Sequence, residues 1–492
     1  MNILIVGNGF DLSHYLPTKY DHFMDVMGAI EEKDLSKYIK TIFNSSVKDL
    51  PTLLIKGLEI KNALNEKHYE MGFDELFSKC REKWFIDKTR KMYAVSSIIL
   101  SFEDLVGLQA KLRNNIWYQY FAQHIREVKT WIDFETKIND ALKVVANFVV
   151  KLENKLDEVG TFDREVCFYG ESEKRQVFLT RETCNILEKL NILSSGYYID
   201  ETDCDENGSF TIPIDIGDSD VGDLRFYIRD ENIINYFGYG KLNKENLLNN
   251  LQVSLDDFIE IFNLYLEKIV SKLSLSKNYL INLEGFNSLD KIISFNYTNT
   301  YQRIHENISI EYLHGSHGEN QNIVLGISDL DDDSLKKLKA YGFTKYHQKL
   351  FKDTHYLFLD EFKRKILLHK KRVEDFERDY HEVDKASQRK FFGIGEKLNL
   401  RIAIWGHSLD VSDKDYILDL FSLNDDIDRN VRVTVYYFDK TAKFSLLNNL
   451  LAILGKDKVE QWMKNKWLCF KPNPEIKFLA QENPDVDQAS SI

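Results

Sequence analysis

The sequence contains little proline and little glycine, the two residues that most often interrupt helices. It has 6 prolines and 23 glycines in 492 residues, against typical frequencies of about 5% and about 7%. This scarcity excludes collagen-like and linker-rich chains and favours long helices. An apolar fraction of 43%, with 13% aromatic residues, supplies a large buried core and excludes disorder over most of the chain.

Closely spaced cysteines and long apolar runs are also missing. Of the 5 cysteines, the nearest pair, Cys167 and Cys184, is 17 positions apart, which predicts free thiols in a reducing compartment. The apolar run Ile3–Val6 ends at Gly7 and is too short for a signal peptide, and no run approaches the ~18 residues of a membrane span. A net charge of −13 disfavours general nucleic-acid binding. We therefore expect a soluble, cytoplasmic protein that binds no membrane.

Six short apolar runs predict buried strands, and five of them follow residue 288. They are Ile3–Val6, Lys291–Phe295, Ile308–Leu313, Asn322–Ile327, Leu400–Trp405 and Val431–Phe438. A single opening strand cannot form a sheet alone, so it must pair with the later strands. The sequence therefore predicts an α/β fold in which residues 1–24 and 286–470 build one Rossmann-like parallel sheet of about six strands.

The region between these two halves has a mainly helical pattern. We expect residues 25–285 to form an inserted helical domain with a small β-rich patch near 161–230, where short β-rich runs alternate with turn residues. A second helical insertion, 333–395, interrupts the sheet domain. Residues 471–492 hold three of the six prolines and are predicted to be a loose tail.

Four polar motifs follow predicted strands directly, and they mark the candidate site. They are Gly7-Asn8-Gly9-Phe10-Asp11, Asn296-Tyr297-Thr298, His314-Gly315-Ser316 and Gly406-His407-Ser408. Ligands of open parallel sheets bind at the carboxyl ends of the strands. The strands before Asn296 and His314 are joined by only residues 296–307, near the minimum for a crossover, so both residues emerge at one edge. We expect them to face each other across one crevice, with the Gly7–Asp11 turn on its wall.

The first motif permits two interpretations. Gly7 and Gly9 allow backbone amides to approach an anion, but the third glycine of a dinucleotide fingerprint is replaced by Leu12, which disfavours hydride transfer. Asp11 either bonds a ribose or caps the turn. No metal is expected, because His314 and His317 lack helical i, i+4 spacing and a nearby third ligand.

A basic cluster offers a different hypothesis. Lys363-Arg364-Lys365 and His369-Lys370-Lys371-Arg372 would suit a nuclease-type toxin, but acidic neighbours such as Glu361 and Glu374 favour a solvated helix face. Nucleic acid is therefore the weaker partner hypothesis.

Taken together, the motifs resemble the AbiH proteins of bacterial phage abortive infection. The resemblance covers essentially the whole chain in the same order, through Ile5–Leu12, Leu16–Thr18, Trp131–Glu135, Ser294–Thr298, His314–Ser316 and Trp405–Leu409. It implies a role in antiphage defence that harms or arrests the infected cell.

AbiH proteins are in turn remotely similar to the sirtuin-like fold, in which an Asn and a His-Gly act on NAD. By position, the resemblance implies that Asn296 and His314 are catalytic. It implies that the residues that bind NAD are Gly7, Asn8, Gly9, Phe10, Asp11, Tyr297, Gly406, His407 and Ser408. Thr298 stands where sirtuin-like proteins usually carry Asp, His407 replaces Thr, and the zinc cysteines are missing. The implied activity is therefore NAD glycohydrolase, with NAD as substrate, and not lysine deacylation.

Two alternatives remain open at this point. The chain is either such an enzyme or a sensor that binds a nucleotide without hydrolysing it and signals through the helical domain; a nuclease-type toxin is a third possibility. The expected partners are NAD or a related nucleotide, a phage-derived trigger, and either a second copy of the chain in a homo-oligomer or a partner defence protein.

Overall fold

A computed structural model of the chain describes residues 1–35, 69–124, 130–168, 173–197, 224–236, 239–276, 279–281, 288–303, 308–354, 358–379, 399–425 and 431–478. The chain divides by its internal contacts into two compact units. Unit 1 comprises Met1–Leu105, Phe262–Ser328 and Lys345–Ile492, and unit 2 comprises Val106–Ile261 and Asp329–Thr344. Compact units are not necessarily domains, so the domain limits at residues 24, 285 and 470 stay predictions.

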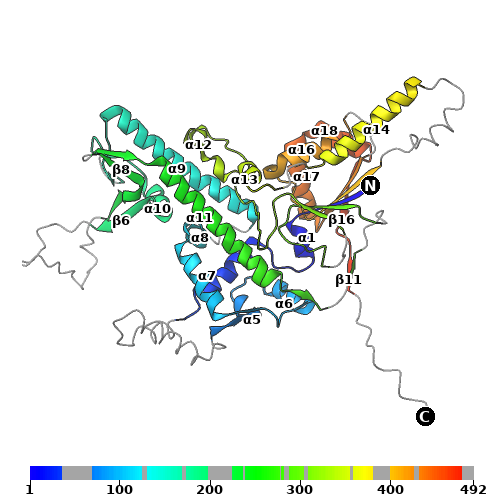
Figure 1. The fold of residues 1–492 in the computed structure, drawn as a ribbon, viewed down its shortest axis with the longest axis horizontal. Helices are drawn as coiled ribbons and strands as arrows, with labels where there is room; N and C mark the ends of the chain where they lie inside the picture. The colour runs from blue at the N-terminus through cyan, green and yellow to red at the C-terminus, as the bar shows by residue number, and fades with distance from the viewer. Residues whose placement is uncertain are drawn as a thin grey trace, which may run out of the picture. The chain divides into compact units, whose positions relative to one another are not determined.

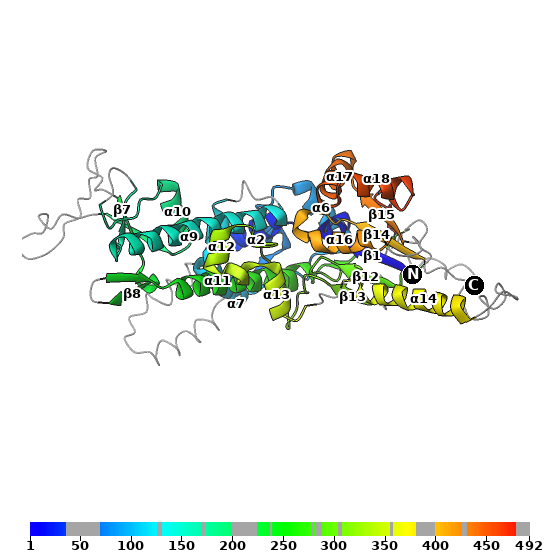
Figure 2. The ribbon, with the colours of Figure 1, turned by 90° about the horizontal axis from the view of Figure 1, so that it is seen from above.

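Unit 1 contains a six-stranded sheet in which all neighbouring strands run parallel (Figures 1 and 2). Its spatial order is β13 (Ile310–Tyr312), β12 (Lys291–Ser294), β1 (Asn2–Val6), β14 (Leu400–Trp405), β15 (Val431–Tyr437) and β16 (Leu468–Pro472). Val6 of β1 pairs with Ser294 on one side and with Trp405 on the other. The predicted α/β, Rossmann-like sheet built from both chain ends is thus confirmed.

Both faces of the sheet are buried, because alternate residues of each strand point to opposite sides. Ile3 and Ile5 join one apolar cluster, and Leu4 and Val6 join the other. The first cluster includes side chains from α14 (Asp360–Asp379), α16 (Lys414–Ser422), α17 (Lys440–Leu454) and α18 (Lys456–Lys464); α16, α17 and α18 lie beside β14 and β15 in Figure 2. The second includes Phe10 of α1 (Asn8–Ser13). Burial on both faces explains why these strands are continuous apolar runs.

The strand predicted over Asn322–Ile327 is wrong. Its backbone is bonded by other groups: the Val324 amide donates to the His314 carbonyl (2.8 Å), and the Gln348 side chain bonds both the amide and the carbonyl of Leu325 (3.0 and 2.9 Å). These bonds replace a neighbouring strand. The apolar pattern arises because Ile323 and Val324 are fully buried.

The sixth strand is instead β16, which extends into the region predicted as a loose tail. Pro472 ends this edge strand, a position where a missing N–H is tolerated. Beyond it, β17 (Ile476–Phe478) pairs antiparallel with β11 (Tyr279–Ile281). Residues 471–478 are therefore structured, and the rest of the predicted tail lies outside the described residues.

The chain after β1 is mainly helical within unit 1. Its described elements there are α2 (Tyr20–Glu31), β2 (Met71–Gly72), α5 (Phe73–Leu76), α6 (Lys83–Met92), β3 (Tyr93–Ala94), β4 (Ile99–Leu100) and β10 (Ser274–Leu275). Two longer helices, α7 (Phe102–Asn114) and α11 (Lys244–Tyr265), continue from one unit into the other. No helix in the described part of the chain combines the length and the hydropathy needed to span a membrane.

Unit 2 is built mainly from helices. They are α8 (Ile116–Ala122), α9 (Trp131–Val159), α10 (Arg181–Lys189) and α12 (Asp333–Leu338), together with most of α7 and α11. A capping box starts α9, in which Thr130 and Asp133 bond each other's backbone amide, and Gly160 ends it with φ +77°. The β elements are β5 (Glu165–Val166), β6 (Leu193–Tyr197), β7 (Leu224–Ile228), β8 (Ile233–Tyr236) and β9 (Tyr239–Leu242), and these strands pair antiparallel.

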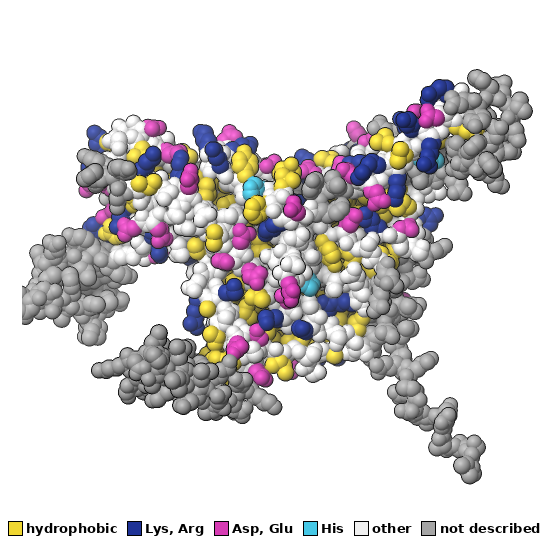
Figure 3. Space-filling view, viewed as in Figure 1, with side chains coloured by type: hydrophobic (Ala, Val, Ile, Leu, Met, Phe, Trp, Pro, Cys, Tyr) yellow, Lys and Arg dark blue, Asp and Glu magenta, His cyan; other side chains and the backbone are white. Residues whose placement is uncertain are grey.

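The basic cluster lies on α14, where basic and acidic side chains are interspersed on the surface (Figure 3). Lys363 lies 3.0 Å from Asp419, and Lys365 lies 2.6 Å from Glu361. These pairs match the solvated helix face that the flanking acidic residues indicate.

Candidate functional site

Two glycine-containing loops meet at the carboxyl ends of β1 and β14. The Gly7 amide donates to the Trp405 carbonyl (3.1 Å), and the Gly9 amide donates to the Gly406 carbonyl (2.8 Å). Gly406 has φ +75°, and a Cβ there would lie 2.0 Å from the Phe10 amide nitrogen. Only glycine fits such a position, so these residues let the two loops pack backbone against backbone.

The amides of Gly7 and Gly9, which the sequence suggested could approach an anion, donate instead to carbonyls at the carboxyl end of β14. The Phe10 amide also has a partner, the Gly7 carbonyl at 2.8 Å. The Phe10 ring belongs to the core and packs edge-on against Trp405, with centroids 5.0 Å apart. The Asn8 side chain accepts a hydrogen bond from the Thr18 hydroxyl (2.6 Å). The glycines thus have a packing role that needs no ligand, and their binding of NAD stays a prediction.

The loop after β12 is tied to the same junction. Asn296 Nδ2 donates to the Gly7 carbonyl (2.9 Å), while the Asp11 carboxylate accepts from the hydroxyls of Thr298 (2.5 Å) and Thr300 (2.6 Å). Asn296 and Asp11 are both buried, and burial raises the pKa of Asp11 although the two hydroxyls lower it. A Thr at position 298 therefore supplies a donor to a carboxylate, which a second Asp there would not do when ionised.

Beside the loop junction, a second group of polar residues lies at the carboxyl ends of β13 and β14. This cluster consists of His314, His407 and Asp413. Asp413 Oδ1 is 3.2 Å from His314 Nε2, and Asp413 Oδ2 is 3.3 Å from His407 Nε2. His407 Nδ1 accepts the Leu409 amide (2.9 Å), so the proton of a neutral His407 is assigned to Nε2, facing Asp413. All three side chains are buried, with 5%, 7% and 8% exposure. One carboxylate thus joins histidines from two of the predicted motifs.

Asp413 reaches the histidines from the start of α16. It occupies the N-cap position, where an Asp side chain usually accepts a helix amide, yet its carboxylate makes no such bond. The 3.2 Å contact between its Oδ1 and His314 Nε2 lacks the alignment of a hydrogen bond, and both atoms are buried. These two atoms therefore keep hydrogen-bonding capacity for another molecule.

Two buried lysines of α13 (Lys345–Phe351) lie beside this cluster. Lys345 Nζ is 3.7 Å from Asp413 Oδ1, and Lys349 Nζ donates to the Tyr416 hydroxyl (2.5 Å). Lys345 and Lys349 are only 6% and 7% exposed. The site therefore combines ammonium groups, a carboxylate and imidazoles in a buried environment.

The charges and the burial shift the pKa values of His314 and Asp413. Burial, followed by the charge of Lys349, lowers the pKa of His314 to about 3, and Asp413 acts in the opposite direction. Burial by itself would raise the pKa of Asp413, but Lys345 and His314 hold it well below its ordinary value. At neutral pH an ionised carboxylate therefore lies beside a neutral imidazole.

The predicted site residues fall into two groups that adjoin at Gly406 and His407. The loop junction contains Gly7, Asn8, Gly9, Phe10, Asp11, Asn296 and Gly406, and the second cluster contains His314 and His407. Tyr297 donates through its hydroxyl to the Val324 carbonyl (3.0 Å), and Ser408 is exposed. Asn296 bonds Gly7, and His314 contacts Asp413, so the two side chains have different partners. The crevice expected between Asn296 and His314 therefore stays a prediction.

Asp413, Lys345 and Lys349 were not predicted from the sequence. The run Asp410-Val411-Ser412-Asp413 has the residue types of a helix start, and nothing in it indicates contact with a histidine. Among the residues that the structure describes, no group of three or more His, Cys, Asp or Glu side chains is arranged to hold a metal ion.

Comparison with known families decides where the chain belongs. The model of the family described as "Bacteriophage abortive infection AbiH" matches residues 3–437. This range includes the loop junction and the cluster of His314, His407 and Asp413. The chain belongs to the AbiH family. No curated protein and no solved structure matches it. Membership of the AbiH family supports a role in phage abortive infection.

Proposed function

We propose that this AbiH protein cleaves the nicotinamide–ribose bond of NAD, with His314 as proton acceptor, and so harms the infected cell. The observation that supports this best is the buried His314–Asp413–His407 cluster. It lies at the carboxyl ends of parallel strands, where such sheets bind ligands. NAD as the substrate rests on the resemblance to sirtuin-like proteins.

In the proposed reaction the bond between the nicotinamide nitrogen and ribose C1′ breaks. Nicotinamide leaves as a neutral molecule with the bonding electron pair, a water oxygen bonds to C1′, and the proton of that water passes to His314. Asp413, whose Oδ1 lies 3.2 Å from His314 Nε2, stabilises the imidazolium by its charge once the proton has arrived. Asn296 is a positioning residue here, because its amide holds the Gly7 carbonyl and thereby the loop after β1.

Substrate binding would itself prepare His314 for this role. With a pKa of about 3, His314 is a weak proton acceptor at pH 7. Lys349 and Lys345 contribute to that low value. The phosphates of NAD, if they approach these ammonium groups, offset their charge and raise the pKa of His314 towards neutrality.

Nicotinamide release from NAD by the purified protein, measured beside phage plaque formation, tests the proposal. We expect His314→Gln to lower the rate of release by roughly 10²- to 10⁴-fold, the usual contribution of a general base, and to abolish defence. His347→Gln is the matched control, because His347 is an exposed histidine of α13, and it should keep both activities. Release by His314→Gln at more than a tenth of the parent rate would exclude His314 as the proton acceptor.

A nucleotide sensor that does not hydrolyse its ligand is the second candidate function. The low pKa of His314 favours it, since a sensor needs no proton acceptor. If the parent protein binds NAD but never releases nicotinamide, and His314→Gln still abolishes defence, the sensor replaces the enzyme.

A further inference from the structure

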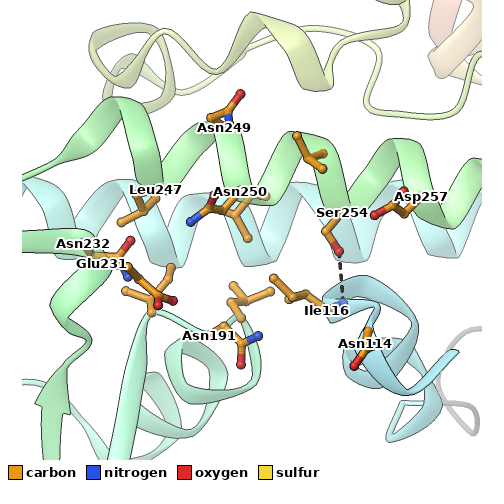
Figure 4. Close-up of a pocket in the computed structure, with 14 residues that line it drawn as sticks. Asn114, Ile116, Asn191, Glu231, Asn232, Leu247, Asn249, Asn250, Ser254 and Asp257 are labelled. Atoms are coloured by element: carbon orange, nitrogen blue, oxygen red, sulfur yellow. Dashed lines mark hydrogen bonds between the residues drawn. The ribbon is translucent and has the colours of Figure 1, made fainter. Parts of the chain in front are cut away.

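A pocket of about 430 Å³ in unit 2 lies far along the chain from the motifs of the candidate site (Figure 4). One wall is a face of α11, on which Leu247, Asn250, Leu251 and Ser254 recur at helical spacing. The other walls come from the turn after α10, the short 3₁₀ helix at Asp230–Asn232 and the start of α8. Its volume falls within the range of small-ligand pockets, roughly 300–1,000 Å³.

Five asparagines belong to the lining of this pocket, of which Asn232 is buried, Asn250 is half-buried and the other three are exposed. They are Asn114, Asn191, Asn232, Asn249 and Asn250. Within the described parts of the chain none of these five side chains makes a hydrogen bond, whereas Asn115, which is not part of the lining, caps α8 and bonds the Ser254 carbonyl. Each free carboxamide offers two donors and one acceptor oxygen.

The side chain of Asn232 gives the strongest indication of a ligand among the five. It is only 2% exposed, and burying an unbonded amide normally costs about 1–3 kcal/mol. Its backbone is satisfied, since its amide donates to the Arg229 carbonyl (3.0 Å) and its carbonyl accepts from the Asn243 amide (2.8 Å). Its side chain, by contrast, belongs to the pocket lining and has no partner among the described residues. A ligand that bonds this carboxamide would remove the cost.

The rest of the lining narrows the chemistry of that ligand. The charged side chains are Glu231 and Asp257, and the described lining includes no Lys, Arg or His, which disfavours nucleotides and other anions. It also includes no aromatic ring, the usual platform for bases. The apolar part of the lining is aliphatic and consists of Leu190, Ile192, Leu247 and Leu251 together with Ile116 and Val253.

We propose that this pocket binds an extended peptide segment that carries a basic side chain between aliphatic ones. Carboxamides bond both the N–H and the C=O of a peptide main chain, the aliphatic lining residues accept apolar side chains, and the two carboxylates favour a Lys or Arg. The site gives unit 2 a means of engaging a partner protein, and it does not depend on NAD cleavage.

Calorimetric titration of the full-length protein with blocked pentapeptides tests this inference. The probes are acetyl-Gly-Val-Lys-Val-Gly-amide and its analogues with norleucine or Glu at the centre. We expect saturable binding that is strongest for Lys, weaker for norleucine and weakest for Glu. Loss of two hydrogen bonds at about 0.5–1.5 kcal/mol each predicts that Asn232→Leu weakens binding of the Lys peptide by roughly 5- to 150-fold.

Two further variants keep the test decisive if Asn232→Leu does not fold. Asn250→Leu changes a half-buried lining residue and should also weaken binding, whereas Asn185→Leu, at an exposed position of α10 outside the lining, should not. No binding of any peptide, or equal binding by parent and Asn250→Leu, would overturn the inference. Binding of spermidine in place of the peptides would also overturn it, because it would identify a polyamine site.

Discussion

Replacement of Gly406 by alanine tests the backbone packing of the β1 and β14 loops. A Cβ at Gly406 would lie 2.0 Å from the Phe10 amide nitrogen, while ordinary van der Waals contact begins at 3.4 Å. The two loops would therefore have to move apart by about 1.4 Å. That movement would break the 2.8 Å bond between the Gly9 amide and the Gly406 carbonyl.

Three effects then add to the free-energy cost of Gly406→Ala. The positive φ of +75° costs an L-residue roughly 1–2 kcal/mol, the overlap roughly 1–3 kcal/mol and the lost hydrogen bond roughly 0.5–1.5 kcal/mol. We therefore expect Gly406→Ala to lower the free energy of unfolding by about 3–6 kcal/mol.

Two other glycines of unit 1 separate these effects. Gly455 also has positive φ, +78°, with ψ 160°, but a Cβ there meets nothing within 4 Å, so Gly455→Ala measures a backbone strain without overlap. Gly7 is extended, with φ −125°, but its Cβ would lie 2.5 Å from the His407 Cα, so Gly7→Ala isolates the overlap.

Urea unfolding of the three variants, followed by circular dichroism, provides the measurement. The expected order of destabilisation places Gly406→Ala above each of the other two. Gly406→Ala should have a lower free energy of unfolding than Gly455→Ala by more than about 1 kcal/mol. A smaller difference would mean that the loops are not packed as described.

Three further predictions concern the buried polar groups. Asp413→Asn should destabilise the protein by roughly 3–5 kcal/mol in urea unfolding, because it leaves Lys345 without this buried counterion; a change below 1 kcal/mol would contradict the contact. Lys349→Met should raise the pKa of His314, since the Lys349 charge lowers it, and a histidine-ring NMR titration that shows no rise would refute this. Burial lowers the pKa of His14 and of His22 to about 4, so the unfolded chain binds protons first; stability should be full above pH 6.5 and fall by roughly 2 kcal/mol per histidine at pH 5. Equal stability in urea at pH 7 and pH 5 would contradict this.

The sheet was predictable because the strands of a parallel sheet are buried on both faces. Residues 400–405 are all apolar except Arg401, and the observed strand has the predicted bounds. The edge strand β16 was missed because Lys471 and Pro472 interrupt its apolar pattern. The apolar segment 322–327 was misassigned because local pattern reports burial and not the identity of the hydrogen-bonding partner, which here is Gln348.

The histidines of the candidate site were predictable from their positions after strands, whereas their carboxylate partner was not. Asp413 lies six residues beyond His407 and ninety-nine beyond His314, and only the fold brings it between them. The glycines had the same ambiguity, because a turn that approaches an anion and a turn that packs on another turn require the same residue. The packing partner of Gly9, Gly406, is almost four hundred positions away.

The position of β1 between β12 and β14 has a consequence for how the protein is made. β1 leaves the ribosome before its neighbour β14, which follows only when Trp405 has been added, about 400 residues later. At a synthesis rate of roughly 5–20 residues per second, this takes about 20–80 s. Until then neither the glycine junction nor the His314–Asp413–His407 cluster is complete, because Gly406, His407 and Asp413 have not yet been translated. A chain that terminates before Asp413 therefore cannot assemble the candidate site.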